Sequence, residues 1–195
     1  MRSSPAQSPR FYEAYLVPLI FGQYAERIAQ RLASRKLTRV LEVAAGTGVV
    51  TRHLASLLPD DVSIVATDLN QPMLDLASKV GTSRPVERRQ ADGMQLPFAD
   101  ESFDAVVCQF GVMFLPDKAK AFSEARRVLK AGGVLLWDRI EESEFAGTVT
   151  TALESLFPDD PLRFMARTPH GYYGVATIQT DLRNGGFARA PCVEA

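Results

Sequence analysis

The 195-residue chain has few cysteines and histidines, no excess charge of either sign and no long apolar run. Its two cysteines, Cys108 and Cys192, lack the spacing of a metal site, so we expect reduced structural thiols and no metal centre. The 22 basic residues against 23 acidic ones give a net charge of −1, which excludes a strongly basic nucleic-acid surface. No apolar stretch is long enough for membrane insertion.

The first ten residues, MRSSPAQSPR, have no apolar core after their charge. We therefore expect a frayed tail rather than a signal peptide, and a cytoplasmic protein.

What the chain does contain is an alternation of short apolar runs with helical stretches. The apolar runs predict strands that begin at Thr38, Val62, Pro85, Phe103 and Gly133. Near-continuous apolar strands separated by helices are typical of a parallel sheet covered on both faces. The sequence therefore predicts a doubly wound α/β fold with a mostly parallel sheet.

We expect a single domain of four segments. Residues 1–36 form an N-terminal helical cap that bends at Pro18, and residues 37–140 form the sheet core. Residues 141–175 form a lid-like insertion, and residues 176–195 form a helix with a glycine stop and a possible strand in RAPCVEA. The cap either closes over a ligand or packs as an ordinary amphipathic helix.

Two glycines, Gly46 and Gly48, follow the first expected strand in the stretch LEVAAGTGVV. Open parallel sheets bind ligands beyond the carboxyl ends of their strands, where bare backbone allows close approach. A tight strand–helix turn without a ligand is the alternative. A dinucleotide site is disfavoured, because Thr51 stands where a third glycine is needed and Glu42 would repel a pyrophosphate. The Glu42 carboxylate would suit a cationic ligand, or it is a buried acid that hydrogen-bonds the loop amides and so orders the loop.

The stretch EVAAGTG resembles the first motif of the class I S-adenosylmethionine-dependent methyltransferases, with Ala44 at the first glycine position. The stretches VATDLN, QADGMQLPFADESFDAVV and RVLKAGGVLLW resemble later motifs in family order, with Ala131 for a usual proline. The resemblance spans Thr38 to Ile140 and is greatest for the small-molecule methyltransferases of ubiquinone and menaquinone biosynthesis. It implies a Rossmann-like methyltransferase fold, S-adenosyl-L-methionine as cofactor and a small, apolar or aromatic methyl acceptor.

The resemblance also implies which residues hold the cofactor. Asp68 would bind both ribose hydroxyls and Asp92 would meet the adenine amino group. The alternatives are a helix N-cap for Asp68, where Asn70 is the better candidate, and a turn before Gly93 for Asp92. The expected cofactor set is Glu42, Ala44, Ala45, Gly46, Gly48, Asp68, Leu69, Met73, Asp92, Gly93, Met94 and Gln109.

Leu69 and Met73 would pack on the adenine faces, although a helical methionine is more often core. Gln109 would either bind the amino-acid part of the cofactor or simply end its strand.

The catalytic group is less evident. An oxygen or nitrogen acceptor has to lose a proton, and His170 in TPHGYYG is the candidate base, whereas His53 suits a surface or packing role. Tyr172 and Tyr173 line the acceptor pocket or fill the core of the lid. A silent S-adenosylmethionine-binding module that stabilises a partner is the main alternative function, and a nucleotide-dependent oxidoreductase is a weaker one.

By the resemblance, the chain lacks the residues for the last strand of the family's sheet. The family closes its sheet with two further strands, and only RAPCVEA is available for one of them. We therefore expect a truncated form whose fifth strand is an apolar edge, prone to pairing with a second copy as a homo-oligomer.

Overall fold

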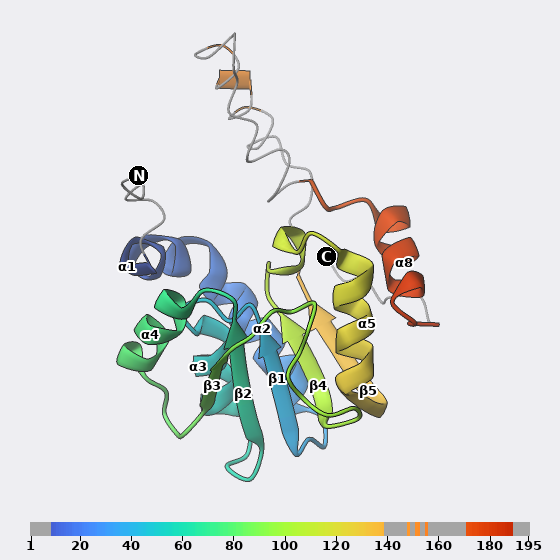
Figure 1. Cartoon of the computed structure of the whole chain (residues 1–195). Helices are drawn as coiled ribbons and strands as arrows, with labels where there is room; N and C mark the ends of the chain where they lie inside the picture. Colours follow the sequence, from blue (N-terminus) through green and yellow to red (C-terminus); the bar gives the residue numbers. More distant parts are fainter. Residues whose placement is uncertain (1–8, 139–147, 149–150, 153–154, 156–170, 189–195) are drawn as a thin grey trace.

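The computed structural model describes residues 9–138, 148, 151–152, 155 and 171–188 (Figure 1). Five strands form one parallel sheet in the order β3-β2-β1-β4-β5. Their bounds are β1 Arg39–Val43, β2 Ser63–Asp68, β3 Glu87–Gln90, β4 Phe103–Cys108 and β5 Leu129–Trp137. The expected doubly wound α/β fold is confirmed. Strand order reverses between β1 and β4, which is where such sheets bind ligands.

Helices cover both faces of the sheet. One core layer joins the sheet to α2 (Gly22–Ala33) and α3 (Val49–Leu57). The other joins it to α5 (Lys118–Val128) and α8 (Val175–Asn184), with the short η3 (Val112–Phe114) nearby. Helix α4 (Gln71–Val80) follows β2. None of the described helices is long and apolar enough to cross a membrane.

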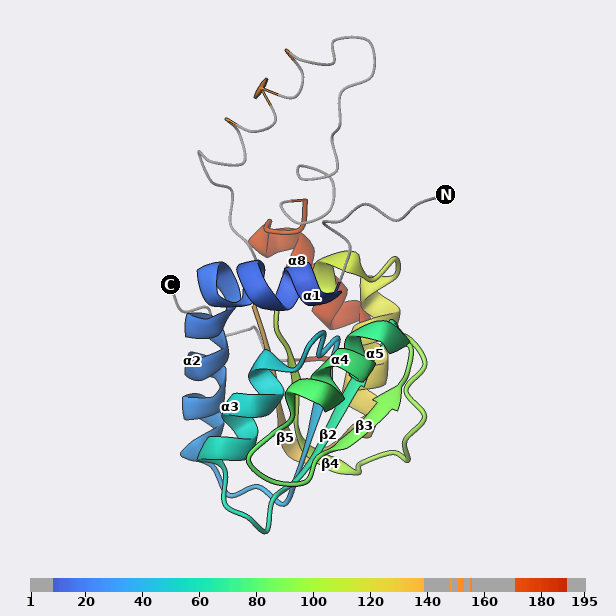
Figure 2. The same cartoon turned by 90° about the vertical axis from the view of Figure 1, so that its left-hand side faces the viewer.

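The N-terminal helices lie over the carboxyl edge of the sheet. Figure 2 shows the segment made of α1 (Pro9–Phe11) and η2 (Tyr12–Phe21) lying across the strand ends, while α2 runs alongside the sheet. The expectation of two helical pieces is confirmed, but their boundary lies at Gly22 and not at Pro18. Pro18 fits inside η2 because this segment is a wide π-helix whose ladder already departs from α-helical bonding.

The start of β5 also differs from the expectation. The expected start was Gly133, because the glycines at 132 and 133 are typical of the end of a preceding helix. Helix α5 instead ends at Val128, and Leu129 turns extended and pairs with Phe103. Burial explains this boundary, because Leu129 is 1% exposed and joins the core only as part of the strand.

The stop of α8 is confirmed. The Gly185 and Gly186 N–H groups donate to the carbonyls of Asp181 and Arg183, and Phe187 packs against the core. Among the described residues, β5 is an edge of the sheet (Figure 1). The expected sixth strand in RAPCVEA and most of the expected lid at 141–175 lie outside the described residues.

Candidate functional site

The turn after β1 is built from left-handed backbone. Ala44, Gly46 and Gly48 have φ angles of 56°, 57° and 85°. Alanine in this conformation is strained by roughly 1–2 kcal/mol, whereas glycine is not. The Ala44 methyl fits because Gly111 faces it: a Cβ at Gly111 would lie 2.6 Å from that of Ala44. Gly48 then serves as the N-cap of α3, so the turn leads directly into a helix N-terminus.

Asp68 ends β2 beside this turn. One of its carboxylate oxygens accepts from the Gly46 N–H and the other from the Asn70 N–H, each at 2.8 Å. Asp68 is therefore not the N-cap of α4. Asn70 holds that position, as expected, but its side chain makes no cap hydrogen bond. The carboxylate fixes the glycine turn and remains partly exposed at the switch point.

Glu42 lies beneath the turn and is 2% exposed. One of its oxygens accepts from the Thr51 hydroxyl at 2.5 Å, so Thr51 takes a specific role at the position where a dinucleotide fold needs glycine. Burial raises the pKa of Glu42 to about 8, and the Thr51 hydrogen bond opposes this only in part. A nearby cation would favour the ionised form.

We expect Glu42→Gln to change how stability depends on pH. A carboxyl whose pKa is raised in the folded state stabilises the fold below its ordinary pKa of about 4.5, and this contribution is lost as pH rises towards 8. Each pH unit in that window costs at most about 1.4 kcal/mol. Urea unfolding across the window should show a flatter profile for the variant. Parallel profiles for the wild type and Glu42→Gln, with exposed Glu87→Gln as the control, would contradict the burial argument.

The N-terminal segment is fastened over the glycine turn. A Cβ added at Gly46 would lie 3.7 Å from the ring and hydroxyl of Tyr12. Burial, then the acids Asp68, Glu13 and Glu42, raise the pKa of Tyr12 above its usual range. Arg52 donates to Glu13 and to the carbonyl of Thr47, both at 2.8 Å. This fastening favours the interpretation of the cap as a cover over the turn.

Two buried oxygens in this cover have no hydrogen-bond partner among the described residues. They are the Thr47 hydroxyl, within the glycine turn, and one carboxylate oxygen of Glu13. Thr47 is 0% exposed, so its hydroxyl, unpaired among the described residues, lies buried inside the site.

The turn after β3 brings Asp92 to the same edge. Asp92 accepts from the Met94 N–H at 2.8 Å, which makes it a turn residue, as the alternative interpretation held. A Cβ on Gly93 would lie 3.0 Å from the Val43 side chain, so this turn packs closely on the end of β1 and any larger residue would push Val43 aside.

Comparison with known proteins decides the family. A model of the methyltransferase domain matches residues 41–137. A demethylmenaquinone methyltransferase from Corynebacterium urealyticum is 34% identical over 170 residues, covering 85% of this chain and 71% of the relative. The chain belongs to the class I S-adenosylmethionine-dependent methyltransferases.

Two further comparisons set the extent of the match. A demethylmenaquinone methyltransferase from Corynebacterium glutamicum (strain R) is 35% identical over 157 residues, covering 79% of this chain. The chain spans 63% of that relative's length. The crystal structure of an S-adenosylmethionine-dependent methyltransferase from Aquifex aeolicus has a TM-score of 0.66 at 18% identity, covering 95% of this chain and 89% of that one. This likeness shows the fold.

S-adenosyl-L-methionine is the cofactor of this methyltransferase. The chemistry of the described residues fits it. The Asp68 carboxylate, partly exposed at the switch point, suits its ribose hydroxyls, and the left-handed turn at Gly46 and Gly48 places bare backbone beside it, beneath the Tyr12 ring. Glu42 lies buried under this turn and orders it through the Thr51 hydroxyl. Among the described residues no group of three or more His, Cys, Asp or Glu could hold a metal ion.

Three other residues of the expected cofactor set differ in their exposure and contacts. Leu69 is 66% exposed beside Asp68, as a residue covered only by a ligand would be, and Met73 is half-buried on α4. The Gln109 amide donates to the Phe21 carbonyl at 3.0 Å, so it joins β4 to the N-terminal segment.

The residues considered for the acceptor pocket and for catalysis lie elsewhere. Tyr172 packs beside Trp137 and donates to Asp181, which makes it a core residue. His170 lies outside the described residues, and His53 is half-buried on α3.

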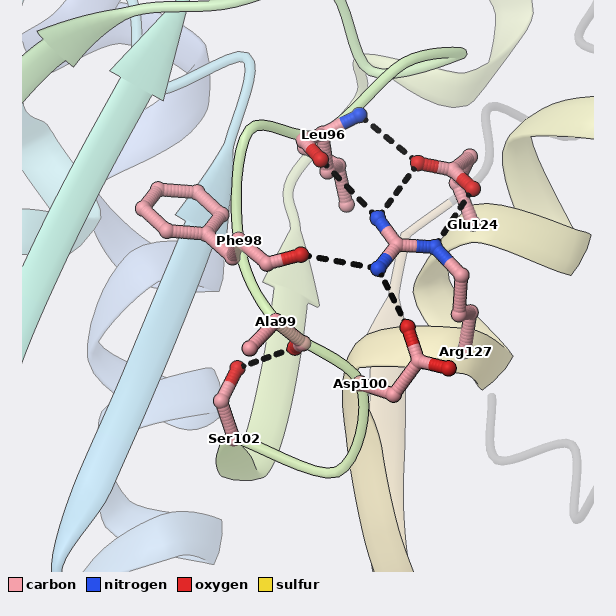
Figure 3. Close-up of polar contacts among 7 residues, drawn as sticks. All are labelled: Leu96, Phe98, Ala99, Asp100, Ser102, Glu124 and Arg127. Atoms are coloured by element: carbon pink, nitrogen blue, oxygen red, sulfur yellow. Dashed lines mark hydrogen bonds and ion pairs between the residues drawn. The ribbon is translucent and has the colours of Figure 1, made fainter.

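The stretch LPFADES is held against α5 by a single arginine. Figure 3 shows the Arg127 guanidinium between this loop and α5. It donates to both oxygens of Glu124, to Asp100, and to the carbonyls of Leu96 and Phe98, at 2.7–2.9 Å. The Leu96 N–H donates back to Glu124 at 2.8 Å. Sequence reasoning missed this arrangement, as it missed Tyr12 and the Arg52–Glu13 pair.

Proposed function

We propose that this methyltransferase moves the methyl group of S-adenosyl-L-methionine to a small aromatic acceptor that carries a hydroxyl group, in the cytoplasm. The observation that carries the proposal is the glycine turn tied to Asp68 at the switch point of the sheet. The names of the relatives, demethylmenaquinone methyltransferases, support an aromatic acceptor. The near-neutral charge gives no support to a nucleic-acid substrate.

We assign the cofactor site to the ends of four strands, β1 to β4. Gly46 and Gly48 give access to the backbone, Asp68 accepts from the ribose hydroxyls, and the turn of Asp92 and Met94 borders the adenine. Leu69 and Met73 cover the ring, and Gln109 approaches the amino-acid part. When bound, the cofactor supplies a methyl group activated on a sulfonium. The ring of Tyr12 has to shift from Gly46 to admit it, because the two would share the same space.

Turnover separates this function from a silent binding module. The protein is incubated with S-adenosylmethionine and a panel of hydroxylated aromatics, quinols and amines, and S-adenosylhomocysteine formation is measured. We expect transfer to at least one hydroxylated aromatic compound. Binding of S-adenosylhomocysteine without transfer to any member of the panel would favour the silent module.

We expect Asp68→Ala to weaken S-adenosylhomocysteine binding more than Asp92→Ala. Asp68 would lose two charge-assisted hydrogen bonds and also release the Gly46 N–H, whereas Asp92 would lose one. At roughly 1.5–3 kcal/mol for each such bond, the losses are about 100-fold or more and about 10-fold. Calorimetry on both folded variants checks the order, and a reversed order would mean that the ribose and adenine positions are exchanged.

A further inference from the structure

Asp138 is an acid at the carboxyl edge that the cofactor assignment does not use. It follows β5 directly and lies level with Gln109, because Trp137 pairs with Cys108 and the Asp138 N–H donates to the Cys108 carbonyl at 3.3 Å. Val134 and Leu136 pack against the core layer of α2 and α3, and strand alternation puts Asp138 on that side.

The Asp138 carboxylate has charged and hydrogen-bonding neighbours, but one of its two oxygens has no hydrogen-bond partner among the described residues. This oxygen, Oδ2, is buried. Burial raises the pKa of Asp138 to about 6, while Arg31 and Arg27 of α2 and a hydrogen bond from Gln109 pull it down. On β4 the buried Cys108 thiol is a titratable group near Asp138, and Glu42 of β1 lies near that thiol. Such a carboxyl changes charge within the range that general bases use.

A short series of contacts joins Asp138 to the cofactor turn. Gln109, its neighbour, donates to the Phe21 carbonyl at 3.0 Å. The Phe21 ring stacks on Tyr12 with centroids 5.2 Å apart, and Tyr12 covers Gly46. Gln109, the neighbour of Asp138, and the glycine turn therefore both contact η2, which lies across this edge of the sheet (Figure 2).

The surroundings of Gln109 are aromatic. Phe110 follows it with a strained φ of 48° and contacts the rings of Phe21 and Tyr24 at centroid distances of 5.6 and 5.2 Å. Aromatic side chains favour stacked or edge-on packing with a flat ring. A carboxylate beside such rings suits an acceptor that is both aromatic and hydroxylated.

We propose that Asp138 is the general base that takes the hydroxyl proton of an aromatic acceptor, with Gln109 as its positioning residue. The inference rests on the proposed methyl transfer. The acceptor O–H bond breaks and its proton goes to Oδ2 of Asp138. The acceptor oxygen uses the electron pair of that O–H bond to form the bond to the methyl carbon, and the methyl–sulfur bond breaks with its electron pair staying on sulfur. Asp138 then passes the proton to water.

The test compares the wild type with Asp138→Asn, which keeps the shape but cannot take a proton. Asp60→Asn removes a fully exposed carboxylate and is the matched control. S-adenosylhomocysteine binding is measured first and should change by less than about twofold in either variant. A wild type that does not bind it would refute the proposed function, before Asp138 is tested.

The probe is 1-naphthol, added to the S-adenosylhomocysteine complex. We expect the wild type to bind it more tightly as pH rises through about 6, and Asp138→Asn to bind it at least about tenfold more weakly without that pH dependence. For any acceptor that turns over, the single-turnover rate should fall at least about 100-fold in Asp138→Asn and recover in part in Asp138→Glu. Failure of the wild-type complex to bind naphthol, equal affinity in Asp138→Asn, or full transfer by that variant would overturn the proposal.

Discussion

Gly46→Val should abolish cofactor binding while leaving the protein folded. Gly46 has a φ of 57°, which a β-branched residue adopts only under strain, and the Tyr12 ring already lies 3.7 Å from the position of a Cβ. The added methyl groups would extend into the space where a ligand meets the backbone. We expect the affinity for S-adenosylhomocysteine to fall by at least about 100-fold, measured by calorimetry.

The control is Gly81→Val. Gly81 also has a positive φ, 81°, but nothing lies within 4 Å of a Cβ there. Both variants should lose stability from backbone strain, by roughly 1–2 kcal/mol or more. Only Gly46→Val should lose cofactor binding. Normal binding by the folded Gly46→Val variant would show that the glycine turn is merely a structural bend.

Arg127→Ala should be the most destabilising surface substitution that we consider. It removes the hydrogen bonds that the guanidinium donates to Glu124, Asp100 and the loop carbonyls, so that Glu124 keeps its bond from the Leu96 N–H but loses its paired cation. Because the arginine side chain is 30% exposed, we discount the charged pairs and expect a loss of about 2–4 kcal/mol, measured by urea unfolding.

Neighbouring Arg126 provides the matched control, because its side chain is exposed. Arg126→Ala should change the unfolding free energy by less than about 0.5 kcal/mol. Arg127→Lys should recover little, since an ammonium cannot form the two-pronged pair with Glu124. If the alanine variants of Arg126 and Arg127 were equally stable, the loop would not depend on this contact.

The sequence predicted β1, β2, β4 and β5 well because each contains an apolar run, and burial leaves such runs few alternatives. The edge strand β3, with the sequence ERRQ, has no such run. Asp68 was predictable for a related reason: it ends β2, and strand ends of a parallel sheet meet at one edge. Asp138 follows β5 in the same way, but its role depends on burial of one oxygen, which no local pattern reports.

The contacts missed from the sequence are long-range side-chain contacts. Glu13 and Arg52 meet across 39 positions, and no periodicity indicates that they will. The rotation of α5 about its own axis decides whether Arg126 or Arg127 reaches the loop, and the sequence does not give this rotation. The predicted end of α5 was wrong because burial of Leu129 in the strand outweighed the tendency of the two glycines to end the helix.

The central claim is that the turn after β1, fixed by Asp68, binds S-adenosylmethionine. The most direct measurement is a calorimetric titration of the wild-type protein with S-adenosylhomocysteine, with NADH as the competing ligand. The account predicts saturable one-to-one binding of S-adenosylhomocysteine, a matching rise in unfolding temperature, and no response to NADH. Binding of NADH, with no heat from S-adenosylhomocysteine up to about 1 mM, would contradict it.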